Sequence, residues 1–229
     1  MATILHIETS ARTCSVALSQ DGALLMHKED SDGPNHAVLC GVFCEEALSF
    51  AESHAIPLDA VAVSQGPGSY TGLRIGVSMA KGIAYGRGVP LVAVPTLPLL
   101  CVPLLLRERV EEGALLVPMI DARRMEVYTA VYDRALRELR HTAAEIITDS
   151  SFSDILAERP VYFFGDGADK CKEVIKHPNA CFMDGVLPLA KNMLPLAERA
   201  FLRGEFQDTA YFEPFYLKEF VAIKSKNLL

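Results

Sequence analysis

The feature that most constrains the fold is a pattern that occurs once in each half of the 229-residue chain. In the first half, the apolar run Ile4–Ile7 ends at Glu8, and a polar turn leads into a second apolar run. In the second half, Leu116–Ile120 ends at Asp121, and a polar turn leads into the β-rich run Glu126–Tyr132. Short apolar runs that alternate with polar turns predict antiparallel strands. Because the same pattern returns about half a chain later, the sequence predicts a duplicated fold.

Alternating helices and strands follow each of these strand clusters. In the first half we expect a strand at 23–28, helices at 36–51 and 72–85, and strands at 61–64 and 91–94. In the second half we expect strands at 136–141, 161–164 and 181–183, and helices at 152–157, 169–176 and 189–202. This order predicts an α/β protein with two ribonuclease-H-like lobes, residues 1–110 and 111–229. Two such lobes facing each other form the actin/Hsp70/sugar-kinase (ASKHA) superfold.

Two acidic residues stand at matching places in the two halves. In the ASKHA superfold, the first strand of each lobe ends near a cleft in which a magnesium nucleotide binds. Glu8 and Asp121 occupy those strand ends here. Each is therefore a candidate contact for a nucleotide or its metal, although acidic residues also cap turns without binding a ligand. Both interpretations are open from the sequence.

A glycine-rich segment, Gln65–Gly76, lies between a predicted strand and a predicted helix. Such a loop directs backbone N–H groups and a helix N-terminus toward a nearby anion. It has neither the Lys-Ser/Thr ending of a P-loop nor the glycine spacing of a Rossmann turn. The glycines also fit a structural role, because they permit a tight turn and close packing of Gly76 against a neighbouring element. The candidate anion or nucleotide contacts are Glu8, Ser69, Thr71, Gly72, Arg74 and Asp121.

Composition excludes some classes of protein. The net charge of −7 argues against a chain that grips nucleic acid by itself, because neutralising phosphates requires clustered Lys and Arg. Six cysteines without a CxxC pair predict buried free thiols rather than a zinc site or a disulfide framework. The charge-free segment 89–106 contains four prolines, so we expect a buried strand, a turn and a helix there instead of a membrane span.

The glycine-rich segment also carries a family resemblance. The run Gly66–Gly76, GPGSYTGLRIG, resembles the signature segment of the TsaB (YeaZ) family. Glu8 stands where that family more often has Asp, which weakens the expectation of magnesium-nucleotide chemistry. Further segments that resemble the family occur in the same order from one end of the chain to the other: 4–10, 121–128, 165–168 and 216–222.

The resemblance implies a cytoplasmic, non-catalytic paralogue of TsaD. Such a subunit forms a heterodimer with TsaD and works with the ATPase TsaE to place threonylcarbamoyl on adenosine 37 of tRNA. It contacts tRNA only through that complex, and it forms a homodimer when alone. The resemblance implies no resident cofactor. It allows weak binding of ATP or ADP at the partner interface.

The spacing of the histidines bears on catalysis. TsaD holds a metal through two histidines one helical turn apart, whereas no two of the six histidines here are three or four residues apart. We therefore expect neither a metal site nor catalytic residues. The alternative is an ATP-binding kinase or hydrolase of the same superfold that uses Glu8, the glycine loop and Asp121.

One predicted helix is apolar on more than one side. Ala37–Cys44 contains no charged or amide side chain over two turns. Val38 and Val42 share one face of that helix, and Leu39 and Phe43 share another. Such a helix is either buried within the monomer or exposed as a partner interface. We predict an interface, which the resemblance assigns to TsaD; its residues are Val38, Leu39, Val42, Phe43, Ile75, Met79 and Ile83.

Overall fold

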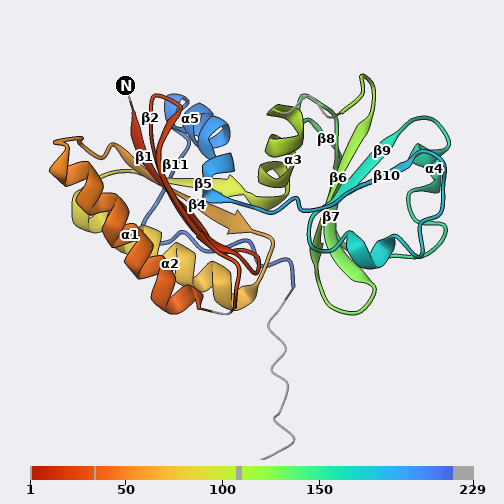
Figure 1. The fold of residues 1–229 in the computed structure, drawn as a ribbon, viewed down its shortest axis with the longest axis horizontal. Coiled ribbons are helices and arrows are strands. Elements are labelled where there is room, and N and C mark those ends of the chain that lie inside the picture. The colour runs from red at the N-terminus through yellow and green to blue at the C-terminus, as the bar shows by residue number, and fades with distance from the viewer. Residues whose placement is uncertain (1, 34, 107–109, 219–229) are drawn as a thin grey trace, which may run out of the picture.

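The protein consists of two lobes with the same arrangement of strands (Figure 1). The computed structural model describes residues 2–33, 35–106 and 110–218. The first-lobe sheet has the order β11-β5-β4-β1-β2-β3, and the second-lobe sheet has the order β10-β9-β6-β7-β8. Apart from β11, the two sheets are built in the same way: three antiparallel strands followed by two parallel ones. The predicted duplicated α/β architecture is therefore confirmed.

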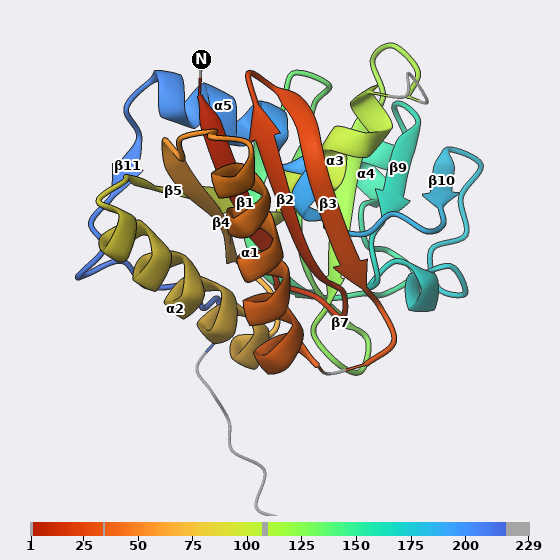
Figure 2. The ribbon, with the colours of Figure 1, turned by 60° about the vertical axis from the view of Figure 1, so that its left-hand side comes forward.

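The first lobe has its sheet between two layers of helices. Helices α1 and α2 lie side by side on one face of the sheet (Figure 2). They pack there against apolar side chains such as Ile7 and Val63. The elements of this lobe are β1 Thr3–Glu8, β2 Cys14–Gln20, β3 Ala23–Asp30, α1 His36–Ser53, β4 Ala60–Gly66, α2 Tyr70–Arg87 and β5 Leu91–Pro95.

The second lobe has less helix than the sequence predicted. The expected helix at 169–176 is a single 3-10 turn, η1 Asp169–Cys171, because Pro178 disfavours the helical conformation at the preceding residue and leaves little room for further turns. The other elements are β6 Leu115–Asp121, β7 Glu126–Tyr132, β8 Glu138–Ile146, α4 Ser153–Leu156, β9 Val161–Phe164 and β10 Ala180–Met183.

Helix α3 (Thr96–Leu106) lies between the two sheets and joins the lobes (Figure 1). Leu99 and Val102 pack against the first lobe, whereas Leu97 and Leu100 pack against the second. A helix that is apolar on all sides is stable when it is buried on all sides, which explains the charge-free segment in the sequence. Among the described residues, no helix has the length and apolar character to cross a membrane.

The chain returns to the first lobe near its C-terminal end. The predicted helix at 189–202 is a 3-10 turn, η2 Ala190–Asn192, followed by α5 Leu194–Leu202, because Pro195 fits only the first turn of a helix. Helix α5 covers the face of the first-lobe sheet that α1 and α2 leave uncovered, and β11 (Phe206–Gln207) pairs with β5. Residues 190–207 therefore belong to the first lobe, although the predicted boundary placed them in the second.

Candidate functional site

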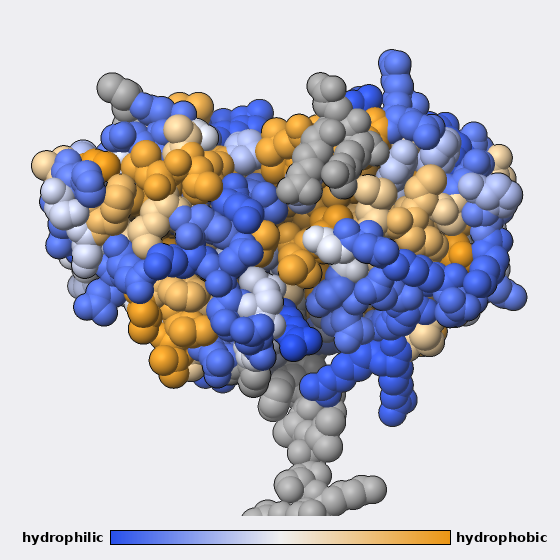
Figure 3. Space-filling view, in the orientation of Figure 1, coloured by the Kyte–Doolittle hydropathy of each residue, from blue (hydrophilic) through white to orange (hydrophobic). Residues whose placement is uncertain are grey.

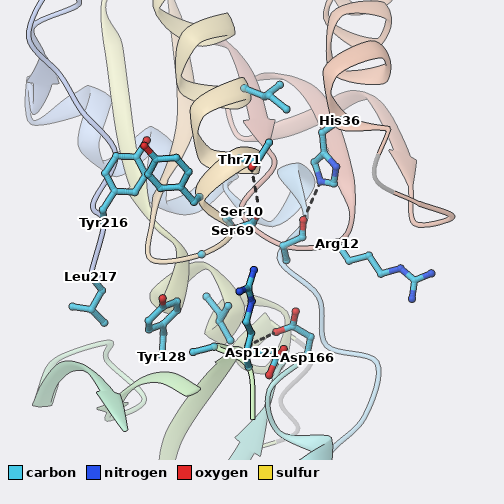
Figure 4. Close-up of a pocket in the computed structure, with 18 of the residues that line it drawn as sticks. Ser10, Arg12, His36, Ser69, Thr71, Asp121, Tyr128, Asp166, Tyr216 and Leu217 are labelled. Atoms are coloured by element: carbon cyan, nitrogen blue, oxygen red, sulfur yellow. Dashed lines mark hydrogen bonds between the residues drawn. The ribbon is translucent and has the colours of Figure 1, made fainter. Parts of the chain in front are cut away.

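A pocket of about 910 Å³ opens between the two lobes (Figure 4). It lies where β1, β4 and β6 end, so the turns that follow these strands form its walls. The first-lobe walls include Ser10–Arg12 and Gly68–Gly72, and the second-lobe wall includes Ile120–Arg123. Ligands of α/β proteins commonly bind at the carboxyl ends of strands. This pocket is therefore the candidate binding site of the molecule.

The glycines of the signature segment let helix α2 pack directly on the turn after β1. A Cβ atom at Gly76 would overlap Thr9 Oγ1, and a Cβ at Gly68 or Gly72 would overlap the backbone oxygen of Ser10 or Thr9. Thr9 Oγ1 also donates a hydrogen bond of 2.8 Å to the Gly72 carbonyl. The geometry supports the structural role for these glycines, since any side chain would push α2 away from the turn.

Of the predicted contacts in this segment, Ser69, Thr71 and Gly72 line the pocket. Ser69 makes hydrogen bonds within the chain: its N–H donates to the Ser10 carbonyl at 2.7 Å, and its Oγ accepts from Gly72 N at 3.2 Å. Ser69 is thus the N-cap of α2. His36, at the start of α1, also faces the pocket and donates from Nε2 to the Ala11 carbonyl at 2.9 Å (Figure 4).

Arg74 does not line the pocket, and its role as an anion contact stays a prediction. It lies one turn into α2, and its side chain is exposed. Its guanidinium carbon is 5.7 Å from the centre of the Tyr70 ring. This position is typical of a cation–π contact at the surface. The pocket-facing side of the helix is instead formed by Thr71, Gly72 and Ile75.

Glu8 is fully buried and does not line the pocket, so the geometry gives no support to its predicted contact with an anion or nucleotide. Its Oε1 accepts hydrogen bonds of 2.5 Å from both the N–H and the hydroxyl of Ser10. Burial raises the pKa of Glu8 to about 7, although the hydrogen bonds from Ser10 oppose part of that rise. The side chain holds the turn that forms the pocket floor, and it has no direct access to a ligand.

Asp121 does reach the pocket, but it is paired with a cation of its own lobe. The Lys170 ammonium forms an ion pair with Asp121 and donates to the Glu126 carbonyl at 2.6 Å. The Asp121 N–H donates to Asp166 Oδ1 at 3.0 Å, and Asp166 also lines the pocket (Figure 4). Sequence reasoning did not identify Lys170 or Asp166 as site residues, because both come from segments more than 40 positions away from Asp121.

A metal ion would need several ligands brought together. Within the described ranges, no group of three or more His, Cys, Asp or Glu residues is placed to hold one. The cysteines of the chain are all free, and five of the six are buried.

The outer surface of helices α1 and α2 separates the two stripes of the predicted interface. Val38 and Val42 point outward, with 68% and 42% of their surface exposed. Leu39 and Phe43 are half-buried and pack against the first-lobe core. The apolar side chains over α1 and α2 form an orange area at the lower left of Figure 3. On α2, the predicted residues Ile75, Met79 and Ile83 are half-buried against the same core.

Comparisons with known proteins cover nearly the whole chain. The TsaD family, described as tRNA N6-adenosine threonylcarbamoyltransferase, matches residues 31–223. The tRNA threonylcarbamoyladenosine biosynthesis protein TsaB of Escherichia coli K12 is 31% identical, with 96% of both chains aligned. TsaB of Bacillus subtilis is 32% identical over 76% of this chain and 75% of its own.

A solved structure agrees with these relatives in sequence and in fold. YeaZ from Pseudomonas aeruginosa is 28% identical and superimposes with a TM-score of 0.80, covering 95% of this chain and all of that one. The end-to-end similarity in sequence and the superposition of the two structures agree. The chain belongs to the TsaB (YeaZ) family of tRNA threonylcarbamoyladenosine biosynthesis proteins, a branch of the TsaD-like proteins.

Proposed function

We propose that this chain is a non-catalytic subunit that binds a TsaD-type threonylcarbamoyltransferase and supports the modification of adenosine 37 in tRNA. The observation that carries the proposal is the alignment of 96% of the chain with E. coli TsaB, whose name assigns it to threonylcarbamoyladenosine biosynthesis. The match of residues 31–223 to the TsaD family adds support, because two proteins of one fold can pair through equivalent surfaces.

The state of the two acidic residues supports a non-catalytic role. In the ASKHA superfold these positions serve a magnesium nucleotide, which requires free carboxylate oxygens. Here Glu8 is buried and hydrogen-bonded to Ser10. Asp121 is paired with Lys170, which occupies the carboxylate with a fixed cation. Adenine nucleotides would therefore bind to this chain weakly and without help from magnesium, and no resident cofactor is part of the proposal.

The outward stripe of α1 supports a protein partner at that surface. Val38 and Val42 lie one helical turn apart, and both are exposed although they are apolar. Covering them with a partner removes apolar surface from water at about 25 cal/mol per Å². The half-buried Met79 and Ile83 on α2 extend the same surface. We propose that α1 and α2 together contact the transferase.

The rest of the proposed assembly follows from the family. A TsaE-type ATPase joins the pair, and the isolated chain associates with a second copy of itself through α1 and α2. The complex works in the cytoplasm, and this chain contacts tRNA only as part of the complex with the transferase. The net charge of −7 supports that last point, because a protein that binds free tRNA by itself needs clustered Lys and Arg side chains.

The proposal is tested by placing a charge on the outward stripe. We expect Val38→Glu and Val42→Glu to weaken association with the TsaD of the same cell at least about 100-fold, because burying an unpaired carboxylate at an apolar contact costs several kcal/mol. Both side chains are exposed in the monomer, so the melting temperature should change by no more than about 2 °C at concentrations at which the unmodified chain is monomeric. Titration calorimetry and thermal melts on the same samples measure the two effects.

Ile146→Glu is the matched control, because Ile146 is a β-branched residue on β8 of the other lobe and is 70% exposed, close to the 68% of Val38. It should leave both affinity and melting temperature unchanged. Leu39→Glu should instead lower the melting temperature, since Leu39 packs against the core. If Val38→Glu and Val42→Glu both bind TsaD as tightly as the unmodified chain does, the proposed interface is wrong.

A further inference from the structure

The segment that follows β11 crosses from the first lobe to the second. We call residues 208–218 the C-terminal strap. It begins with a turn in which Asp208 Oδ1 accepts hydrogen bonds from Ala210 N at 2.7 Å and Tyr211 N at 3.3 Å. Its last three residues line the interlobe pocket. The strap is therefore a further connection between the lobes, in addition to α3 and to the segment that runs from β10 back to η2 (Figure 1).

The first half of the strap is attached to α2 and β4. Lys81 Nζ donates to the carbonyl oxygens of Phe212 at 2.9 Å and Ala210 at 3.3 Å. The Phe215 N–H donates to the Gln65 carbonyl at 2.7 Å. The Phe212 side chain packs against the core beneath α1 and α2. This half belongs structurally to the first lobe.

The glycine segment is shaped to receive the strap. Gly66 has a φ of +106°, and a Cβ atom there would lie 2.7 Å from the carbonyl oxygen of Phe215. A side chain at this position would combine backbone strain with a clash against the strap. The same loop that packs on the turn after β1 therefore also seats the C-terminal part of the chain.

The second half of the strap reaches across the pocket. The Tyr216 ring packs against Tyr70 of α2 in a tilted arrangement, with 4.7 Å between ring centres. Leu217 follows on the side of the pocket where Tyr128 of the second lobe lies (Figure 4). Lys218 then forms an ion pair with Glu126 of β7. One end of this short segment is thus held by the first lobe and the other by the second.

We propose that the C-terminal strap is a releasable clamp that holds the two lobes at one opening and forms a wall of the pocket between them. Among the described residues, the contacts that close it include a ring pair and a partly exposed ion pair, both weak. Those that anchor its first half include three hydrogen bonds and a half-buried ring in the core. The Tyr216–Lys218 end therefore detaches first, and the lobes can then turn about α3 and the segment between β10 and η2.

If the strap is a clamp, a substitution that removes its contact with one lobe should speed hydrogen exchange in the pocket wall of the other lobe. Tyr216 touches the first lobe, and Lys218 touches the second. We expect Tyr216→Ala to speed amide hydrogen exchange in the second-lobe wall, residues 120–128, about tenfold. Lys218→Met should speed exchange in the first-lobe wall, residues 66–74, by a smaller factor of about two to five. Exchange followed by mass spectrometry on the full chain measures both, and small-angle scattering should show a larger radius of gyration.

Matched controls distinguish the clamp from a general loss of stability. Tyr211→Ala removes a strap tyrosine that is 84% exposed, and Lys172→Met removes a lysine that pairs with Asp169 and Asp184 of its own lobe. Neither should change exchange in the opposite wall. Tyr216→Phe keeps the ring and should restore slow exchange. If Tyr216→Ala and Lys218→Met alter only the wall each residue touches, the strap is a surface segment and not a clamp.

Discussion

At the scale of single residues, Glu8 lies at the end of β1, but its side chain is buried and holds a turn. It ends β1, where the superfold expects a ligand-binding acid, yet it is fully buried and bound to Ser10. Burial without a cation disfavours the ionised form, so the pKa of Glu8 rises to about 7. The residue thus shapes the pocket floor through the turn it holds.

This rise makes stability depend on pH. The unfolded chain loses the Glu8 proton near the ordinary glutamate pKa of 4.5, whereas burial raises the pKa in the folded chain to about 7. Folding therefore becomes less favourable as pH rises through that window, by about 3 kcal/mol in total. Glu8→Gln cannot ionise, so we expect its unfolding free energy to fall less between pH 5 and 7.5 than that of the unmodified chain. Urea titrations at both pH values measure the difference.

The titration of His6 does not affect the comparison between Glu8→Gln and the unmodified chain. Burial lowers the pKa of His6 to about 3, which opposes folding as pH falls below 6.5 in both proteins alike. An exposed acid, Glu158→Gln, serves as the control and should leave the pH dependence unchanged. Equal pH dependence in Glu8→Gln and the unmodified chain would show that Glu8 is ionised in the folded state.

At the scale of elements, helix α2 contributes to the pocket, to the seat of the strap and to the proposed partner surface. It packs on the turn after β1 through glycines, it holds the strap through Lys81 and Tyr70, and it carries part of the proposed partner surface. A shift of this helix would therefore change the pocket, the strap and the partner surface together.

Two glycines of α2 provide a matched test of that packing. A Cβ at Gly76 would overlap Thr9 Oγ1, whereas nothing lies within 4 Å of a Cβ at Gly82. We expect Gly76→Ala to lower the unfolding free energy by about 3 kcal/mol through overpacking. Gly82→Ala should raise it by up to about 1 kcal/mol, because alanine favours the helix. Denaturant unfolding measures both; a stabilised Gly76→Ala would mean that α2 can move away from the turn freely.

At the scale of the whole molecule, the duplication places two related lobes around a pocket, and the two acids predicted to serve it both have partners within the chain. Glu8 is buried and hydrogen-bonded to Ser10, and the partly exposed Asp121 is paired with Lys170. The proposed role as a partner-binding subunit rests in part on this state of the two acids.

A titration of the isolated chain with ATP tests this interpretation. We expect binding weaker than about 1 mM, with no gain in affinity when magnesium is added, because the carboxylate that would meet the metal is already paired. Asp121→Ala should leave the calorimetric titration unchanged. Micromolar, magnesium-dependent binding that disappears in Asp121→Ala would favour the kinase or hydrolase alternative.

Much of the fold could be predicted from the sequence, because strands and helices leave local periodic patterns. The apolar runs ending at Glu8 and Asp121 are the first strands of the two sheets, and their repetition showed the duplication. The helix predictions were less accurate near Pro178 and Pro195, where the helices in the structure are shorter than the predicted ones. The glycine segment was also informative, since glycines with a required spacing mark close backbone packing.

The tertiary structure decided what depends on distant parts of the chain. Only the fold shows that Glu8 points inward, that Lys170 pairs with Asp121, and that Val38 faces outward while Leu39 faces the core. Residues 190–218 return to the first lobe and the pocket for the same reason: partners of Ala190, Phe212 and Lys218 lie more than 90 positions away. Local sequence determines which elements form, because neighbouring residues set backbone preference and apolar spacing. Which side chains meet at a site is determined by how the sheets and helices pack, and no local pattern records that.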